Sequence, residues 1–274
     1  MGTYVFDQAW DQERERLGAL EDGADGATIR YLAALGVAPG WRCLEVGGGA
    51  GSIARWLAER VGAAGHVVAT DLDPRFLAAE RRPNLEVRRH DILADPLEVA
   101  AFDLVHVRAV LEHLPARAAA LTRLVAATRP GGWVLVEDTF FGGPMAAAIG
   151  ACTSPGGVGT PDARTYHAVA TLFEARGARA DYGPRLPEAL QAAGLVDVGA
   201  ELHARFVRGG AARDFRRLTL EQLRGPLLQR GLLTEAELAQ ALALTWREDA
   251  SYLPIAWVSA WGRRPPAAAA APGG

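Results

Sequence analysis

A glycine-rich turn directly after a short apolar segment is the part of this sequence with the clearest chemical potential. Glu45, Gly47, Gly49 and Gly51 alternate with other residues, and an amphipathic segment with one apolar face follows. This order predicts a strand, a tight turn and a helix. The backbone N–H groups of such a turn and the positive end of its helix suit an adenosyl ligand that carries a carboxylate or a phosphate.

The spacing of the glycines bears on which ligand would bind. The dinucleotide fingerprint requires Gly or Ala at its sixth position, and counting from Gly47 this chain has Ser52 there. Ser52 and the position of Glu45 therefore disfavour an NAD-dependent oxidoreductase. A turn whose glycines bind no ligand is the alternative to both readings.

Two acidic residues follow the next two predicted strands. Asp71 comes directly after 66–70, and Asp91 follows 85–88. Ligands of open α/β sheets bind outside the carboxyl ends of the strands, so we expect both carboxylates beside the glycine turn. Either residue alone could instead be a helix cap or a solvated loop acid.

Strands and helices alternate through the first half of the chain, which predicts a parallel sheet covered on both faces. The predicted strands are 43–46, 66–70, 85–88, 102–107 and 133–136. The predicted helices are 4–24, which we expect outside the sheet, then 28–36, 53–61, 75–81 and one that Pro115 opens.

The alternation stops after the fifth strand. An insertion over 139–185, with a loop at 153–161, is expected to be a lid or a wall of the substrate site. The last two strands are expected at 195–207 and 254–261, with a helical insertion over 209–250 between them. We therefore expect one domain over 1–264, with 1–30 as an N-terminal cap and 265–274 as a low-complexity tail.

Composition excludes several classes of protein. Formal net charge is −3, and every one of the 29 basic residues is Arg, with no dense basic run, so nucleic-acid binding is not expected. No apolar run reaches the roughly 18–20 residues that cross a bilayer. The first residues do not resemble a secretion signal, and Cys43 and Cys152 are too few for a disulfide framework. We expect a cytoplasmic monomer or homodimer without a bound metal.

These separated motifs together resemble the class I S-adenosylmethionine (SAM)-dependent methyltransferases, most closely those of bacteria that act on small molecules. The resemblance covers roughly residues 31–199. It implies a Rossmann-like α/β fold with a seven-stranded, mostly parallel sheet, helices on both faces, an N-terminal helical cap and helical lid insertions. The last strand would enter antiparallel.

The resemblance also implies roles for residues at the cofactor site. Asp71 would accept hydrogen bonds from the ribose hydroxyls, and Leu72 would pack on the adenine. Asp91 would accept from the adenine amine, with a backbone contact from Ile92. The residues that would hold the methionine portion of SAM are Glu45, Gly47, Gly49, Gly51, Val107 and Arg108.

Methyl transfer can require one proton to be removed from the acceptor. His113, just past the fourth predicted strand, is the first candidate base, since its ordinary pKa of about 6.5 suits proton uptake near neutrality. Asp138 and His167 are further candidates. His113 could instead cap a helix, and Glu112 could orient His113 but is expected in solvent.

Aromatic residues could form a substrate chamber, or they could fill the core between lid and sheet. They are Tyr4, Phe6, Trp10, Phe140, Phe141, Tyr166 and Phe173, together with Met145. The predicted function is methyl transfer from SAM to a small organic molecule in natural-product biosynthesis, with oxygen favoured over nitrogen or carbon as acceptor. The alternative is an enzyme that uses bound SAM, without consuming it, to support a cyclisation or rearrangement.

Overall fold

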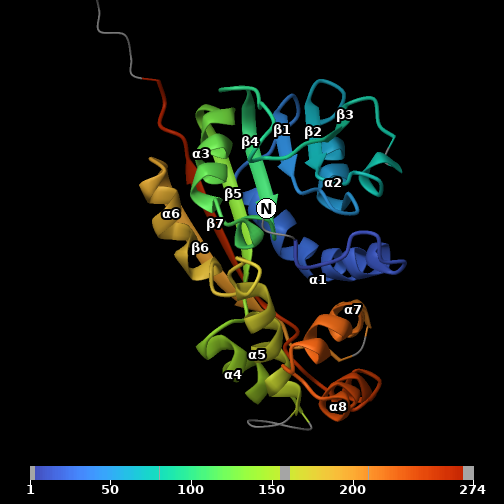
Figure 1. The fold of residues 1–274 in the computed structure, drawn as a ribbon. Helices are drawn as coiled ribbons and strands as arrows, with labels where there is room; N and C mark the ends of the chain where they lie inside the picture. Colours follow the sequence, from blue (N-terminus) through green and yellow to red (C-terminus); the bar gives the residue numbers. More distant parts are fainter. Residues whose placement is uncertain (1–3, 80, 155–160, 209, 268–274) are drawn as a thin grey trace, which may run out of the picture.

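A seven-stranded sheet forms the centre of the molecule in the computed structural model, which describes residues 4–79, 81–154, 161–208 and 210–267 (Figure 1). The strand order is β3-β2-β1-β4-β5-β7-β6, and only β7 runs antiparallel to its neighbours. The strands are β1 (Arg42–Val46), β2 (His66–Asp71), β3 (Leu85–Arg89), β4 (Phe102–Arg108), β5 (Thr128–Phe140), β6 (Val196–Ala204) and β7 (Ala256–Arg263). The predicted Rossmann-like methyltransferase fold is confirmed.

Helices cover both faces of the sheet because the central strands are apolar on both sides. On one face, α1 (Glu13–Ala34) and α2 (Ser52–Val61) bury Leu32 and Leu57 against the strands. On the other face, α3 (Arg117–Ala127) and α6 (Leu186–Ala192) bury Leu124 and Leu190. This two-sided core holds the carboxyl ends of β1, β2 and β4 in fixed positions.

The N-terminal region differs from the prediction. Two separate helices, 4–24 and 28–36, were expected, but α1 runs without a break from Glu13 to Ala34. The helix continues through Asp25 because this side chain and Thr28 are held from outside by Arg108. Tertiary contacts thus override the turn-forming tendency of Asp25-Gly26.

The predicted helix over 75–81 is wrong for the described part of that range. A short 3-10 turn, Leu77–Ala79, stands in its place. The Asp71 carboxylate accepts from the N–H of Asp73, and the Asp73 carboxylate accepts from the N–H of Arg75. These local side-chain bonds favour turns over a propagating helix.

A second group of helices lies below the carboxyl ends of the strands, and its helix α7 packs beside α1 (Figure 1). It consists of α4 (Pro144–Ala151), α5 (Pro161–Glu174), α7 (Gly210–Gln229) and α8 (Glu235–Thr245), which share one hydrophobic cluster. The helical character expected for 139–185 and 209–250 matches these elements, although residues 155–160 and 209 lie outside the described chain. Most of the predicted tail lies outside it as well.

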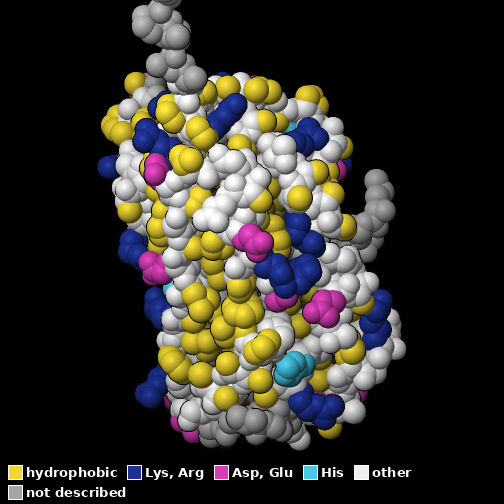
Figure 2. All heavy atoms as spheres, turned by 90° about the vertical axis from the view of Figure 1, so that its left-hand side faces the viewer, with side chains coloured by type: hydrophobic (Ala, Val, Ile, Leu, Met, Phe, Trp, Pro, Cys, Tyr) yellow, Lys and Arg dark blue, Asp and Glu magenta, His cyan; other side chains and the backbone are white. Residues whose placement is uncertain are grey.

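The charges on the face that carries α6 and α4 are mixed. Figure 2 shows arginine side chains there beside acidic and apolar ones, with no broad basic surface. Within the described residues, no helix is both long and apolar enough to span a bilayer.

Candidate functional site

The glycine turn after β1 is built around positive backbone angles. Gly47 has φ +73°, and a Cβ there would lie 2.3 Å from a methyl carbon of Val110. The N–H groups of Gly47 and Gly48 donate to the carbonyl of Thr70 at 2.8 and 3.0 Å. Only glycine allows the chain both this conformation and this close approach to the loop after β4.

A cavity of about 150 Å³, here called the inner cavity, lies over this turn. Carboxylates dominate its polar lining: Glu13, Glu21, Glu45, Asp71, Asp73 and Asp91 outnumber Arg75 and Arg108. The structure brings eight of the predicted cofactor residues to this one cavity. They are Glu45, Gly47, Gly49, Asp71, Leu72, Asp91, Ile92 and Arg108.

Two predicted cofactor residues do not line the inner cavity. Gly51, with φ +97°, is the residue that precedes α2. Val107 is fully buried in the core between the sheet and α3. Gly51 thus shapes the start of α2, and Val107 packs in the core beneath the inner cavity.

Hydrogen bonds from backbone N–H groups hold the Asp71 and Asp91 carboxylates at the edge of the inner cavity. Asp71 accepts from the N–H of Gly49 at 3.1 Å, which ties the end of β2 to the glycine turn. Burial raises the pKa of Asp71. Asp91 accepts from the N–H of Leu93 at 2.8 Å, and Ile92 is buried beside it.

The side of the inner cavity opposite the strands belongs to α1, which sequence reasoning did not connect with the site. Glu21 accepts from the N–H groups of Ala50 and Ser52, at 3.0 and 3.4 Å, at the start of α2. A carboxylate in this position is stabilised by the positive end of the helix. The only local signal is the spacing of Glu21, Asp25 and Thr28, which puts three polar side chains on one face of a helix.

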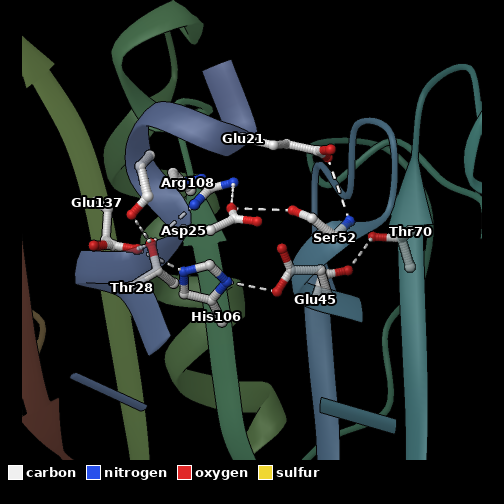
Figure 3. A network of polar contacts seen from close by, with 10 residues as sticks. Glu21, Asp25, Thr28, Glu45, Ser52, Thr70, His106, Arg108 and Glu137 are labelled. Carbon is white, nitrogen blue, oxygen red and sulfur yellow. Dashed lines mark hydrogen bonds and ion pairs between the residues drawn. The ribbon is translucent and has the colours of Figure 1, made fainter. Parts of the chain in front are cut away.

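A buried polar network continues beneath the inner cavity (Figure 3). Arg108 donates to Asp25 and to the Thr28 hydroxyl, both at 2.9 Å. Asp25 also accepts from the Ser52 hydroxyl at 3.1 Å, and Thr28 donates to Glu137 at 2.6 Å. The network thus links α1 to the ends of β4 and β5.

His106 is the centre of this network. Its Nδ1 atom lies 2.5 Å from Glu45 and its Nε2 atom 3.0 Å from Glu137. Burial alone would lower the pKa of His106, but the two carboxylates raise it to about 9. Burial would raise the pKa of Glu137, but the bond from His106 lowers it to about 2. At neutral pH His106 is therefore an imidazolium beside the ionised Glu137 carboxylate.

A second cavity, here called the aromatic chamber, adjoins the inner cavity. The two share Tyr4, Leu20, Ala109 and His113 as lining residues. Of the aromatic residues proposed from the sequence, Tyr4, Phe6, Phe141, Tyr166 and Phe173 line the chamber; Trp10, Phe140 and Met145 line neither cavity. Two buried arginines complete the wall: Arg16 pairs with Glu13, and Arg216 donates to Thr165.

His113 stands where the two cavities meet. Its ring is surrounded by Tyr4, Phe6 and Phe173, with ring centroids 4.9–6.3 Å away. Its Nδ1 atom is buried and has no hydrogen-bond partner among the described residues. Burial and the nearby Arg16 charge lower the pKa of His113 to about 3. The imidazole is therefore uncharged at pH 7.

Two carboxyl groups lie behind His113. Glu112 is 2% exposed, so the expectation that it lies in solvent is wrong. One of its oxygens lies 3.4 Å from His113 Nε2, and the other accepts from the N–H of Thr139 at 2.8 Å. Burial raises the pKa of Glu112 to about 7.

Asp138 is completely buried next to Glu112 and lines neither the inner cavity nor the aromatic chamber. Burial and the Glu112 charge raise its pKa well above the ordinary value. His167 lies exposed on α5 and also lines neither cavity. Of the three candidate bases, the structure thus brings only His113 to the site. No group of three or more metal-ligating side chains occurs among the described residues.

Part of this chain is similar to known methyltransferases. Residues 44–136 match the family described as "Methyltransferase domain". The chain is 35% identical over 133 residues to "Methyltransferase str3" of Strobilurus tenacellus, across 48% of this chain and 47% of that protein. It is 33% identical over 113 residues to the ubiquinone/menaquinone biosynthesis C-methyltransferase UbiE of Laribacter hongkongensis, across 39% and 46%. The chain thus matches about half the length of these curated relatives.

Among solved structures, the fold is similar to that of Haemonchus contortus phosphoethanolamine N-methyltransferase 2 in complex with phosphomonomethylethanolamine and S-adenosylhomocysteine. The TM-score is 0.55 at 18% identity, over 88% of this chain and 52% of that one. Strand order and glycine turn define the class I methyltransferase fold. Within this fold, residues 44–136 are the part of the chain that matches a methyltransferase domain.

Proposed function

We propose that this protein binds SAM in the inner cavity and transfers its methyl group to a small molecule held in the aromatic chamber. The observation that carries the proposal is that the two cavities meet at one neutral, buried histidine, His113. An acceptor in the chamber would face the inner cavity at this junction, and such alignment supplies much of the rate of a displacement reaction.

The lining of the inner cavity fits SAM. Asp71 and Asp91, at the ends of neighbouring strands, offer carboxylates to ribose hydroxyls and to an adenine amine, which are donors. The excess of carboxylates favours a ligand with cationic groups. When bound, SAM would supply an electrophilic methyl group on a sulfonium. The similar Haemonchus structure, a complex with S-adenosylhomocysteine, supports the same ligand.

His113 is the proposed base. With Nε2 directed toward Glu112, the unpartnered Nδ1 atom is available to accept a proton from an acceptor hydroxyl. Glu112 would orient the ring and stabilise the imidazolium that forms. A phenolic or enolic acceptor fits best, because the chamber is lined by aromatic rings. An acceptor of this kind also supports a role in natural-product biosynthesis. The C-methyltransferase relative makes an acidic carbon of a quinol the next acceptor to test.

The test measures product and cofactor together. The purified chain is incubated with SAM labelled in its methyl group and a panel of phenols, naphthols and quinols, and S-adenosylhomocysteine release is followed. We expect label in the product, a loss of about 10²–10⁴-fold in kcat for His113→Ala, and an unchanged affinity for S-adenosylhomocysteine. His167→Ala, an exposed histidine on α5, is the matched control and should behave as wild type.

Three results would contradict the proposal. They are absence of S-adenosylhomocysteine binding, a His113→Ala variant with wild-type turnover across pH, and a product formed with SAM intact. The last would support the cyclisation or rearrangement alternative.

A further inference from the structure

A third cavity opens on the far side of the aromatic chamber. This outer cavity, of about 280 Å³, is bounded by α1, the end of β6 with the segment 204–208, the start of α7, and 254–257. It shares Leu20, Phe215, Pro254 and Ile255 with the aromatic chamber. Leu20 lines all three cavities. The inner cavity, the chamber and the outer cavity therefore adjoin one another around Leu20 of α1.

The junction between the chamber and the outer cavity is apolar. All four shared residues carry hydrocarbon or aromatic side chains. Beyond them the outer cavity continues with Trp257 and with Phe206, which is 59% exposed. A large aromatic side chain left this open to water is a feature of binding surfaces when it borders a cavity.

The far part of the outer cavity is basic. Arg205 and Arg208 both line it and are exposed, and neither forms an ion pair or a side-chain hydrogen bond within the described residues. The titratable groups that face them are Asp22 on α1 and His203 on β6. His203 contacts the Ser259 hydroxyl at 3.1 Å, and burial lowers its pKa, so it is neutral at pH 7. Two guanidinium groups thus face one carboxylate.

We propose that the acceptor is an elongated molecule with an apolar body and an anionic group, a carboxylate or a phosphate, at the end remote from the atom that is methylated. The methylated end lies at His113, the apolar body crosses the junction at Leu20 and Ile255, and the anion binds Arg205 and Arg208. Guanidinium groups bind carboxylates and phosphates with paired, charge-assisted hydrogen bonds. This inference rests on the proposed function for the position of the reacting end.

The probe is a homologous series of linear carboxylic acids from octanoic to tetradecanoic acid, with alkyl phosphates and alcohols of the same lengths. Binding to the full chain is measured by equilibrium dialysis. We expect affinity to rise with length, and alcohols to bind about tenfold more weakly than the acids. Tighter binding of the phosphates or of the carboxylates identifies which anion the site prefers, and either result supports the proposal.

Two variants test where the anionic group and the apolar body of the ligand bind. Arg205→Ala/Arg208→Ala should abolish the difference between acids and alcohols, whereas Arg14→Ala/Arg230→Ala, which removes two exposed arginines elsewhere, should preserve it. Ile255→Trp should narrow the junction and weaken the longest acids most. Equal binding of acids and alcohols to wild type, or an Arg205/Arg208 variant that behaves as its control, overturns the proposal.

S-adenosylhomocysteine binding, measured on the same preparations, keeps this test separate from that of the proposed function. Its loss in wild type would count against methyl transfer but would leave the dialysis result on the outer cavity interpretable.

Discussion

The Nδ1 atom of His106 lies 2.5 Å from Glu45, while its Nε2 atom lies 3.0 Å from Glu137. Glu45 lines the inner cavity, and Glu137 accepts from Thr28 on α1 and from Ser259 on β7. One buried imidazolium therefore connects the floor of the inner cavity to the helix that covers it.

Replacing His106 should destabilise the fold and change its pH dependence. A folded-state pKa of about 9, above the ordinary 6.5, means that His106 stabilises the fold fully below pH 6.5 and loses this effect as pH rises through 9. The shift corresponds to about 3 kcal/mol. His106→Leu leaves two buried carboxylates without their cation, so we expect a loss of about 3–5 kcal/mol at pH 6.

Urea unfolding at pH 6 and pH 10 measures both effects. Wild type should lose stability between the two pH values by clearly more than His106→Leu does. His66→Leu, which removes a half-exposed histidine 3.5 Å from Glu86, is the control and should stay within about 0.5 kcal/mol of wild type. Parallel pH profiles for wild type and His106→Leu would show that His106 is not charged in the folded protein.

The close approach of the glycine turn to Val110 can be tested with a pair of glycine variants. Gly47→Ala places a methyl group 2.3 Å from Val110 in a backbone conformation with φ +73°, so we expect a loss of at least about 1–2 kcal/mol of stability. Gly26→Ala, on the exposed side of α1 with nothing within 4 Å, should stabilise the fold by roughly 0.5–1 kcal/mol. Thermal unfolding compares them; equal midpoints would refute the close approach at Gly47.

Glu21 is expected to hold α1 over the inner cavity. Glu21→Ala removes the acceptor for the N–H groups of Ala50 and Ser52, so the cap should close less tightly and S-adenosylhomocysteine should bind about tenfold more weakly. Glu15→Ala, an exposed carboxylate on the same helix, is the matched control. Calorimetric titration with S-adenosylhomocysteine compares the two variants. Equal affinities of Glu21→Ala and Glu15→Ala would show that Glu21 is not part of the site.

Local patterns predicted the sheet well, because each strand carries its own apolar signal and each turn its own glycine or aspartate. The glycine turn, Asp71 and Asp91 could be assigned to one site because parallel strands end at a common edge. His113 could be proposed for the same reason, since it directly follows β4.

Long-range contacts could not be predicted in this way. The continuity of α1 depends on the bonds that Arg108 donates to Asp25 and Thr28, which lie 83 and 80 positions before it. The burial of Glu112 likewise depends on Thr139, on the neighbouring strand. His106 reads as a strand residue in the sequence, and nothing near it in the chain indicates the two carboxylates that determine its charge.

The central claim is that SAM binds over the glycine turn with its ribose on Asp71, and calorimetric titration with S-adenosylhomocysteine tests it most directly. We predict saturable binding of one molecule per chain by wild type and by Asp11→Ala, an exposed control. Asp71→Ala should bind more weakly by about 2–4 kcal/mol, because a charged acceptor for two hydroxyl groups is lost. Equal affinities of Asp71→Ala and wild type, or no binding by wild type at saturating ligand, would contradict the assignment.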